Sequence, residues 1–216
     1  MNKPKVSLVL ASSSPYRRAQ LEQIGAIFLC ENPIFNEASA KDPSLSPISL
    51  AESLARGKAF SLQGKYPTAV ILGADQLVAF DRGQGSKNQV CIGNKSEKLL
   101  GKPGSKAAAV EQLFLMAGKK HRLITSVCLI TADKIFKHTD IAVLQMRDLS
   151  RKQIEAYVEA DNPVDCAGSY KLESAGIGLF ESIRSDDFSA IQGLPLLKLS
   201  AWFAELGLPS SKLSTF

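Results

Sequence analysis

Short apolar runs alternate with helix-start signals along most of the chain, and this alternation constrains the fold more than any other feature. The run Val6–Ala11 is followed by Ser14-Pro15, where the serine can cap a helix and the proline suits its first position. Ser46-Pro47 repeats the signal, and Ser150 with Gln153 has the spacing of a capping box. Strands that alternate with helices are typical of an α/β fold with a mixed sheet.

The same patterns predict individual elements. Strands are expected at Val6–Ala11, Ile27–Cys30, Ala69–Leu72 and Ile177–Phe180, with Leu77–Phe80 as further extended chain. Helices are expected at Pro15–Ile24, Pro47–Gln63, 105–116, 150–160 and Leu194–Leu206. An antiparallel hairpin is expected at His121–Ile130 and Lys134–Val143. Residues 31–46 are expected to form a polar connection, and residues 81–104 a long hairpin or flap.

Composition limits the class of protein. The chain has 216 residues, of which 45% are hydrophobic and 22% charged, so a disordered chain is excluded and one domain spanning residues 1–216 is expected. The run Val6–Ala11 is too short for a signal peptide, and no stretch is long enough for a membrane helix. Four cysteines without a close pair favour reduced thiols in a cytoplasmic protein over disulfides or a zinc site.

The net charge of +5 is concentrated in one segment. Between Arg82 and Lys106 there are six basic residues and one acidic residue, Glu97. Such a basic flap is either ordinary solvated surface or a segment that lies near an anionic ligand. A basic protein also raises the possibility of nucleic-acid binding, although the rest of this chain is neutral overall.

Two loops carry candidate chemistry. Residues Ala11–Arg18 place Ser12, Ser14 and two arginines at the start of a helix, where free N–H groups and the helix dipole favour phosphate. Neither a P-loop nor a dinucleotide-binding motif occurs, and a simple strand-to-helix turn is the alternative. Asp75 is expected at the carboxyl end of a strand, where it could hold Mg²⁺ or orient water, or merely form a turn.

Three further side chains are candidates of the same kind. Lys58 lies in the second predicted helix, and Lys102 lies in Gly101-Lys-Pro103 at the end of the flap. Either lysine could be a solvated charge or a phosphate contact. Glu173 follows a turn rich in small residues and could contact a base or a metal, or be a surface carboxylate.

These motifs together resemble the Maf family of nucleoside triphosphate pyrophosphatases. The resemblance extends from Leu8 to Leu206 and includes Ala11–Arg18, Glu37, Lys58, Gly73–Gln76, Gly101–Pro103, Ala167–Glu173, Gly176–Gly178 and Gly193–Pro195. It implies a fold similar to that of inosine triphosphate pyrophosphatases, with two lobes around a cleft. It also implies hydrolysis of a nucleoside triphosphate to monophosphate and pyrophosphate, a divalent cation (Mg²⁺ or Mn²⁺) and usually a homodimer.

Three positions suggest a branch of the family. The branch that cleaves dTTP and UTP typically has arginine, threonine and glutamine where this chain has Tyr16, Gln76 and Glu173. The chain therefore resembles the branch that acts on 7-methyl-GTP, whose cationic base suits a carboxylate and an aromatic face. The segment between Asp81 and Gly101 is longer than is usual in the family.

The resemblance implies roles for single residues. Asp75 is expected to activate water, and Lys58, Lys102 and Arg18 to neutralise the triphosphate. Glu37 and Asp75 are expected to hold the metal, Ser12 and Ser14 to bind phosphate oxygens, and Tyr16, Gln76 and Glu173 to contact the rest of the nucleotide. The alternatives are a dTTP or UTP pyrophosphatase of the same family, or a non-enzymatic nucleic-acid-binding or septum-related regulator. Neither a membrane association nor a stable nucleic-acid complex is expected.

Overall fold

The structure, a computed structural model, describes residues 8–40, 42, 44–81 and 97–208, and has a mixed α/β fold. Its strands are β1 (Leu8–Ala11), β2 (Phe28–Glu31), β3 (Val70–Asp81), β4 (Glu97–Leu100), β5 (Lys120–Ile130), β6 (Ile135–Met146) and β7 (Phe180–Arg184). They form a seven-stranded sheet in the order β2-β1-β3-β5-β6-β7, with β4 paired to β3. β1 is parallel to β2 and β3, whereas the β3–β4 and β6–β7 pairs are antiparallel.

The described residues also form seven α-helices, of which the last two follow β7. They are α1 (Pro15–Gln23), α2 (Glu37–Ala40), α3 (Pro47–Phe60), α4 (Lys106–Met116), α5 (Arg151–Asp161), α6 (Phe188–Ile191) and α7 (Leu196–Glu205). Two short 3₁₀ helices lie at Ala167–Ser169 and Ala175–Leu179. Ser14, Ser46, Ser105 and Ser150 cap α1, α3, α4 and α5, which confirms the helix starts expected from the sequence.

The chain divides into two compact units, which agrees with the expectation of two lobes. The first unit comprises Met1–Asp75, Thr125–Asp140 and Asp187–Phe216, and the second comprises Gln76–Ile124 and Ile141–Asp186. The chain passes from one unit to the other within β3, β5 and β6, and again between Asp186 and Asp187.

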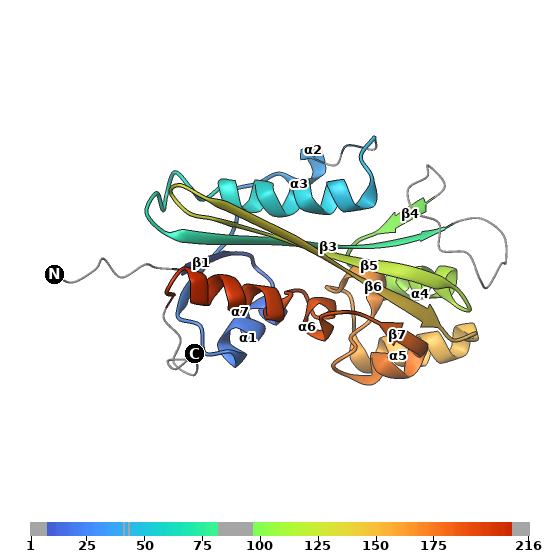
Figure 1. Ribbon diagram of the computed structural model, residues 1–216. Coiled ribbons are helices and arrows are strands. Elements are labelled where there is room, and N and C mark those ends of the chain that lie inside the picture. Colours follow the sequence, from blue (N-terminus) through green and yellow to red (C-terminus); the bar gives the residue numbers. More distant parts are fainter. Residues whose placement is uncertain (1–7, 41, 43, 82–96, 209–216) are drawn as a thin grey trace. The chain divides into compact units, whose positions relative to one another are not determined.

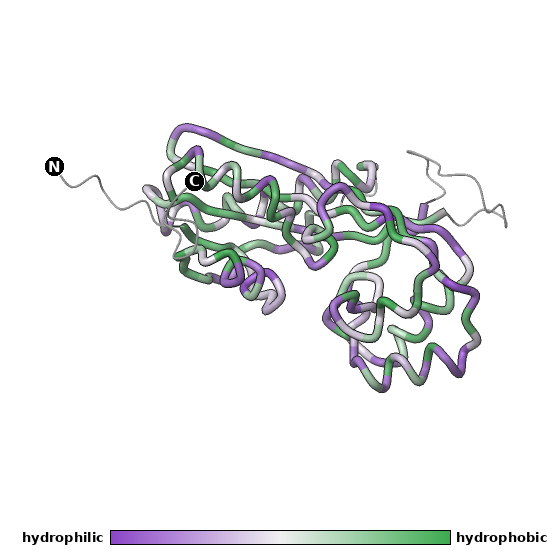
Figure 2. The backbone as a smooth tube through the Cα atoms, turned by 60° about the horizontal axis from the view of Figure 1, so that its bottom comes forward, coloured by the Kyte–Doolittle hydropathy of each residue, from purple (hydrophilic) through white to green (hydrophobic). Residues whose placement is uncertain are grey.

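Helices cover both faces of the strands in the first unit, with α3 on one side and α1 and α7 on the other (Figure 1). Because side chains alternate along a strand, Leu8 and Leu10 pack toward α1 and α7. Val9 and Ala11 pack toward Ala55 and other residues of α3. Full burial on both faces explains why β1 is apolar throughout. The tube in Figure 2 changes repeatedly between hydrophilic and hydrophobic colours along the helices, as expected for helices that bury one face.

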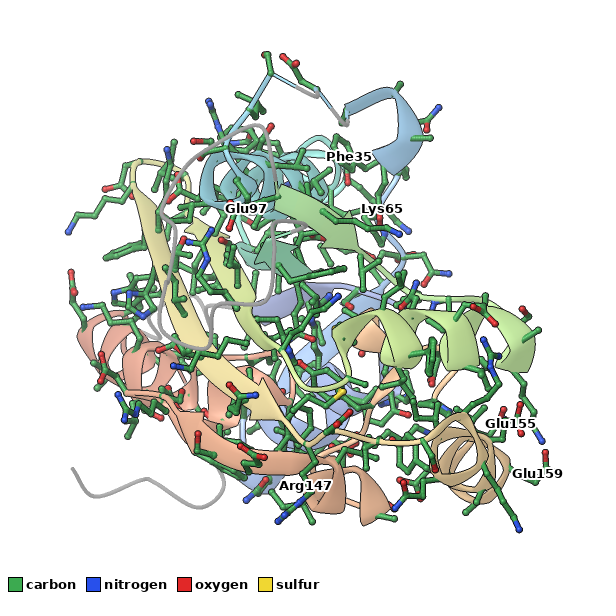
Figure 3. The ribbon with its side chains drawn as sticks, turned by 90° about the vertical axis from the view of Figure 1, so that its right-hand side faces the viewer. Phe35, Lys65, Glu97, Arg147, Glu155 and Glu159 are labelled. Atoms are coloured by element: carbon green, nitrogen blue, oxygen red, sulfur yellow. The ribbon has the colours of Figure 1, made fainter. Side chains whose placement is uncertain are left out.

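The second unit has its own buried polar and aromatic groups. The rings of His121, Tyr170 and Phe180 pack together, and burial lowers the pKa of His121 to about 3, so this imidazole is neutral. Arg122 of β5 donates to Glu97 of β4 at 2.6 Å, and both side chains are buried. Figure 3 labels Glu97 at the start of β4, which follows residues 82–96 in the sequence.

Several expected boundaries were wrong. Extended chain does not break at Gly73–Gln76, because β3 runs without interruption through twelve residues. The strand expected at Ile177–Phe180 is largely 3₁₀ helix, and the strand begins at Phe180. The connection at residues 31–46 and the segment before α7 each contain a four-residue helix, α2 and α6. Most of the expected flap lies outside the described residues.

Candidate active site

The first part of the site is the turn between β1 and α1. Ser12 is buried directly after β1, and its Oγ accepts from the backbone N–H of Ser14 at 3.1 Å. Ser14 is the N-cap of α1, and its side chain accepts from the backbone N–H of Arg17. Both serines therefore lie at the amino end of a nine-residue helix, where unpaired N–H groups favour an anion.

Arg17 is the arginine that faces this turn. Its Nη1 donates to Ser12 Oγ at 3.4 Å, and its Nε donates to the carbonyl of Gly193 at 3.2 Å. Burial lowers the pKa of Arg17, while the negative charges of Asp75 and Glu37 act in the opposite direction. Arg17 thus contacts Ser12 of this turn and interacts electrostatically with both carboxylates.

Arg18 points elsewhere. Its Nε donates to Glu22 Oε1 at 3.1 Å within α1, and 62% of its side chain is exposed. Sequence reasoning selected Arg18 and missed Arg17. Helical periodicity could have separated them, because Arg17 shares a face with the buried Leu21 one turn later, whereas Arg18 shares a face with the polar Glu22.

Asp75 and Lys58 form a buried pair. Along β3, Asp75 has the same parity as Ile71 and Gly73, so its side chain points toward α3, which carries Lys58. Lys58 Nζ donates to Asp75 Oδ1 at 2.6 Å and lies 2.9 Å from Glu37 Oε1 on α2. Only 8% of the Lys58 side chain and 7% of the Asp75 side chain are exposed, whereas Glu37 is half exposed.

Gly73 makes this approach of strand and helix possible. A Cβ atom at Gly73 would lie 2.2 Å from the carbonyl oxygen of Ala55 and 2.6 Å from the backbone nitrogen of Ala59. Only glycine therefore allows β3 to pass this close to α3. That close packing brings Asp75, two residues farther along β3, within reach of Lys58.

Opposing effects act on the pKa of Asp75. Burial raises its pKa, while Lys58 and Arg17 lower it and Glu37 raises it. Its second oxygen, Oδ2, is buried and has no hydrogen-bond partner among the described residues. A buried carboxylate oxygen without a partner can accept a proton or bind a cation. Leaving it without a partner lowers the stability of the fold, so its presence points to a functional role.

The remaining candidate residues belong to the second unit or lie on α1. Gln76 follows Asp75 on β3 and is half-buried, and Tyr16 is half-buried in the first turn of α1. Lys102 and Glu173 are both exposed. The loops that carry them are linked, because the Gly168 N–H donates to the Gly101 carbonyl at 3.4 Å.

Gly168 fixes the turn before Glu173. Its φ is +76°, and a Cβ atom there would lie 2.7 Å from Val78 Cγ2 of β3. Tyr170 and Leu172 are buried, whereas Glu173 projects to the surface of the unit. The small-residue turn expected from the sequence thus packs tightly and leaves Glu173 accessible to a ligand.

Other classes of site find little support in the described residues. No group of three histidine, cysteine, aspartate or glutamate side chains in this part of the chain could hold a metal by itself. Cys30, Cys128 and Cys166 are reduced, and Cys91 lies outside the described ranges. Among the helices that the structure describes, none is long and apolar enough to cross a membrane.

Comparison with known proteins places this arrangement in a family. Residues 7–206 match the family described as Maf-like protein. A 7-methyl-GTP pyrophosphatase of Bdellovibrio bacteriovorus is 44% identical over 91% of this chain and 95% of its own length. Proteins of the same name from Syntrophotalea carbinolica and Hahella chejuensis are each 36% identical, over 93% and 95% of this chain and 95% and 96% of their own. Because the match covers nearly the whole chain, the protein belongs to the Maf family.

Proposed function

We propose that the protein hydrolyses 7-methyl-GTP to 7-methyl-GMP and pyrophosphate. The observation that carries the proposal is the buried Lys58–Asp75 pair. Asp75 Oδ2 has no partner among the described residues, and it belongs to the same unit as the turn with Ser12 and Ser14. The relatives named 7-methyl-GTP pyrophosphatase support this substrate. So do Tyr16, Gln76 and Glu173, which are the residues expected for that branch.

The reaction needs a base for water and positive charge for the triphosphate. Water attacks the α phosphorus, its proton passes to Asp75, and the bond between the α phosphorus and the bridging oxygen breaks to release pyrophosphate. A raised pKa makes the Asp75 carboxylate a stronger base than an exposed aspartate. Arg17, Lys58 and Lys102 stabilise the charge on the phosphates, with Arg17 taking the role expected for Arg18.

A divalent cation fits the same residues. Mg²⁺ in proteins is commonly held by one or two carboxylates together with water and substrate phosphates. Asp75 and Glu37 supply two carboxylates that both pair with Lys58, and Asp75 Oδ2 is a buried acceptor that needs a partner. When bound there, Mg²⁺ or Mn²⁺ would neutralise phosphate charge and lower the pKa of a bound water.

Substrate choice depends on charge at the base. Methylation at N7 makes guanine cationic and leaves its N1–H and N2–H₂ donors. Glu173 offers these groups an accessible carboxylate, and Tyr16 offers an aromatic face.

We further propose that the protein works in the cytoplasm as a homodimer.

A test of the reaction measures both possible products. The wild-type protein with Mg²⁺ should release pyrophosphate, and no orthophosphate, from 7-methyl-GTP. Asp75→Asn should retain the folded circular dichroism spectrum and lose roughly 10²-fold or more in rate, which is the effect of one general base. Orthophosphate as the product, or wild-type turnover in the variant, would contradict the proposal.

A further inference from the structure

The segment from Asp187 to Leu197, which contains α6 and leads into α7, is closely hydrogen-bonded within the first unit. The Asp187 carboxylate accepts from the backbone N–H groups of Ser189 and Leu197, each at 2.9 Å, and also from the Ser189 hydroxyl. Ser189 Oγ in turn accepts from the Leu196 N–H at 2.7 Å. These bonds hold the backbone carbonyls of the segment in fixed directions.

Helix α1 binds those carbonyls through two side chains one turn apart. Gln20 Nε2 donates to the Ser189 carbonyl at 2.7 Å and to the Leu194 carbonyl at 3.4 Å. Arg17 Nε donates to the Gly193 carbonyl, which lies between these two acceptors in the sequence. Gly193 has a φ of +128°, and a Cβ atom there would lie 3.2 Å from Arg17 Cγ, so Arg17 packs directly against this residue.

Packing alone does not account for glutamine at position 20. Gln20 is only 3% exposed, and its Oε1 has no hydrogen-bond partner among the described residues. Leucine has a similar size and would fill the same space without an unpaired oxygen. What glutamine adds is an amide donor that holds the two carbonyls flanking Gly193.

We propose that Gln20 is a positioning residue for Arg17. By fixing the carbonyls of Ser189 and Leu194, it fixes the Gly193 carbonyl, and that carbonyl orients the Arg17 guanidinium toward Ser12 and the carboxylates. An arginine oriented in advance loses less conformational freedom when it binds phosphate. The inference rests on the proposed function, in which Arg17 contacts the triphosphate.

The test compares Gln20→Leu with Gln145→Leu. Gln145 is a matched control, because its Nε2 also donates to two backbone carbonyls, those of Gly118 and Met146, but in the second unit. Calorimetry with inorganic tripolyphosphate should show about 10-fold weaker binding for Gln20→Leu, the loss of about one charged contact, and unchanged binding for Gln145→Leu. Equal affinities in the two variants would overturn the proposal.

A double-mutant cycle separates positioning from a general structural effect. Gln20→Leu should lower kcat/KM for 7-methyl-GTP about 10-fold in the wild-type background, and by less than about 2-fold when Arg17→Lys is already present. The same fold loss in both backgrounds would mean that Gln20 does not act through Arg17. Tripolyphosphate binding can be measured even if 7-methyl-GTP is not hydrolysed. A failure of the proposed function is therefore distinguishable from a failure of the inference about Gln20.

A measurement on the wild-type protein covers the case in which Gln20→Leu does not fold. The Arg17 Nε–H is bonded to a fixed carbonyl, so its NMR signal, assigned by its loss in Arg17→Lys, should exchange slowly with solvent. The exposed Arg18 Nε–H provides the comparison within the same helix. Equally fast exchange of the two signals would contradict a fixed guanidinium.

Discussion

Arg17 and Arg18 are adjacent in the sequence, yet they have different surroundings. The helix turns by about 100° per residue, so neighbouring side chains point to different sides. Arg17 contacts Ser12 and Gly193, whereas Arg18 pairs with Glu22 at the surface. The sequence identifies the charged turn, but the phase of the helix decides which arginine faces Ser12.

This difference can be measured with a matched pair of variants. Arg17→Ala should lower kcat/KM for 7-methyl-GTP by about 10²-fold, because it removes a charged donor next to the turn proposed to bind phosphate. Arg18→Ala removes the same side chain from the surface and should change kcat/KM by less than about 2-fold. Steady-state kinetics would contradict the placement if the two variants lost activity equally.

The pKa of Asp75 predicts a pH dependence at the same scale. Burial raises this pKa above 3.8, so the fold favours the protonated carboxyl. Its contribution to stability is therefore fully present below about pH 3.8, the unfolded value, and is lost as the pH rises through the folded pKa. Activity should instead increase as the pH rises, because Asp75 must be ionised to act as a base.

Urea unfolding and kinetics at a series of pH values check both signs. The free energy of unfolding of the wild type, relative to Asp75→Asn, should decrease as the pH rises. The decrease of wild-type kcat at acidic pH should have an apparent pKa above the ordinary pKa of aspartate. A relative stability that increases with pH would mean that Lys58 and Arg17 outweigh burial.

At the scale of elements, the packing of α3 against β3 determines the site. The sequence predicted α3 and both ends of β3, because a serine cap and apolar runs are local signals. It did not predict that β3 continues through Asp75, since Gly73 normally suggests a break in a strand. The reason for Gly73 is the backbone of α3, which is distant in sequence, and local patterns carry no information about such contacts.

Gly73→Ala tests this packing directly. The new methyl group would overlap the Ala55 carbonyl, so the free energy of unfolding should fall by more than ~2 kcal/mol, and activity should fall as Asp75 moves from Lys58. Gly64→Ala is the control, because a Cβ atom there meets nothing within 4 Å. Its stability should stay within about 0.5 kcal/mol of the wild type. Similar urea midpoints for the two variants would show that β3 and α3 are not in close contact.

Charge is the relevant property at the scale of the whole molecule. The net charge of +5 equals the excess between Arg82 and Lys106, so the basic residues of this segment other than Lys102 should attract polyanionic nucleotides without taking part in chemistry. Replacing Lys87, Lys95 and Lys98 together with glutamine should raise KM for 7-methyl-GTP at low ionic strength and leave kcat unchanged. An unchanged KM at low salt would mean that this segment has no role in substrate capture.

The identity of the substrate is the central claim, and Glu173 gives it a direct test. The measurement is the ratio of kcat/KM for 7-methyl-GTP to kcat/KM for UTP, by pyrophosphate release, in the wild type and in Glu173→Gln. The wild type should prefer 7-methyl-GTP, and the variant should lose roughly 10- to 150-fold of that preference, because the carboxylate pairs with the cationic base. A wild type that prefers UTP, or equal losses on both nucleotides, would contradict the account.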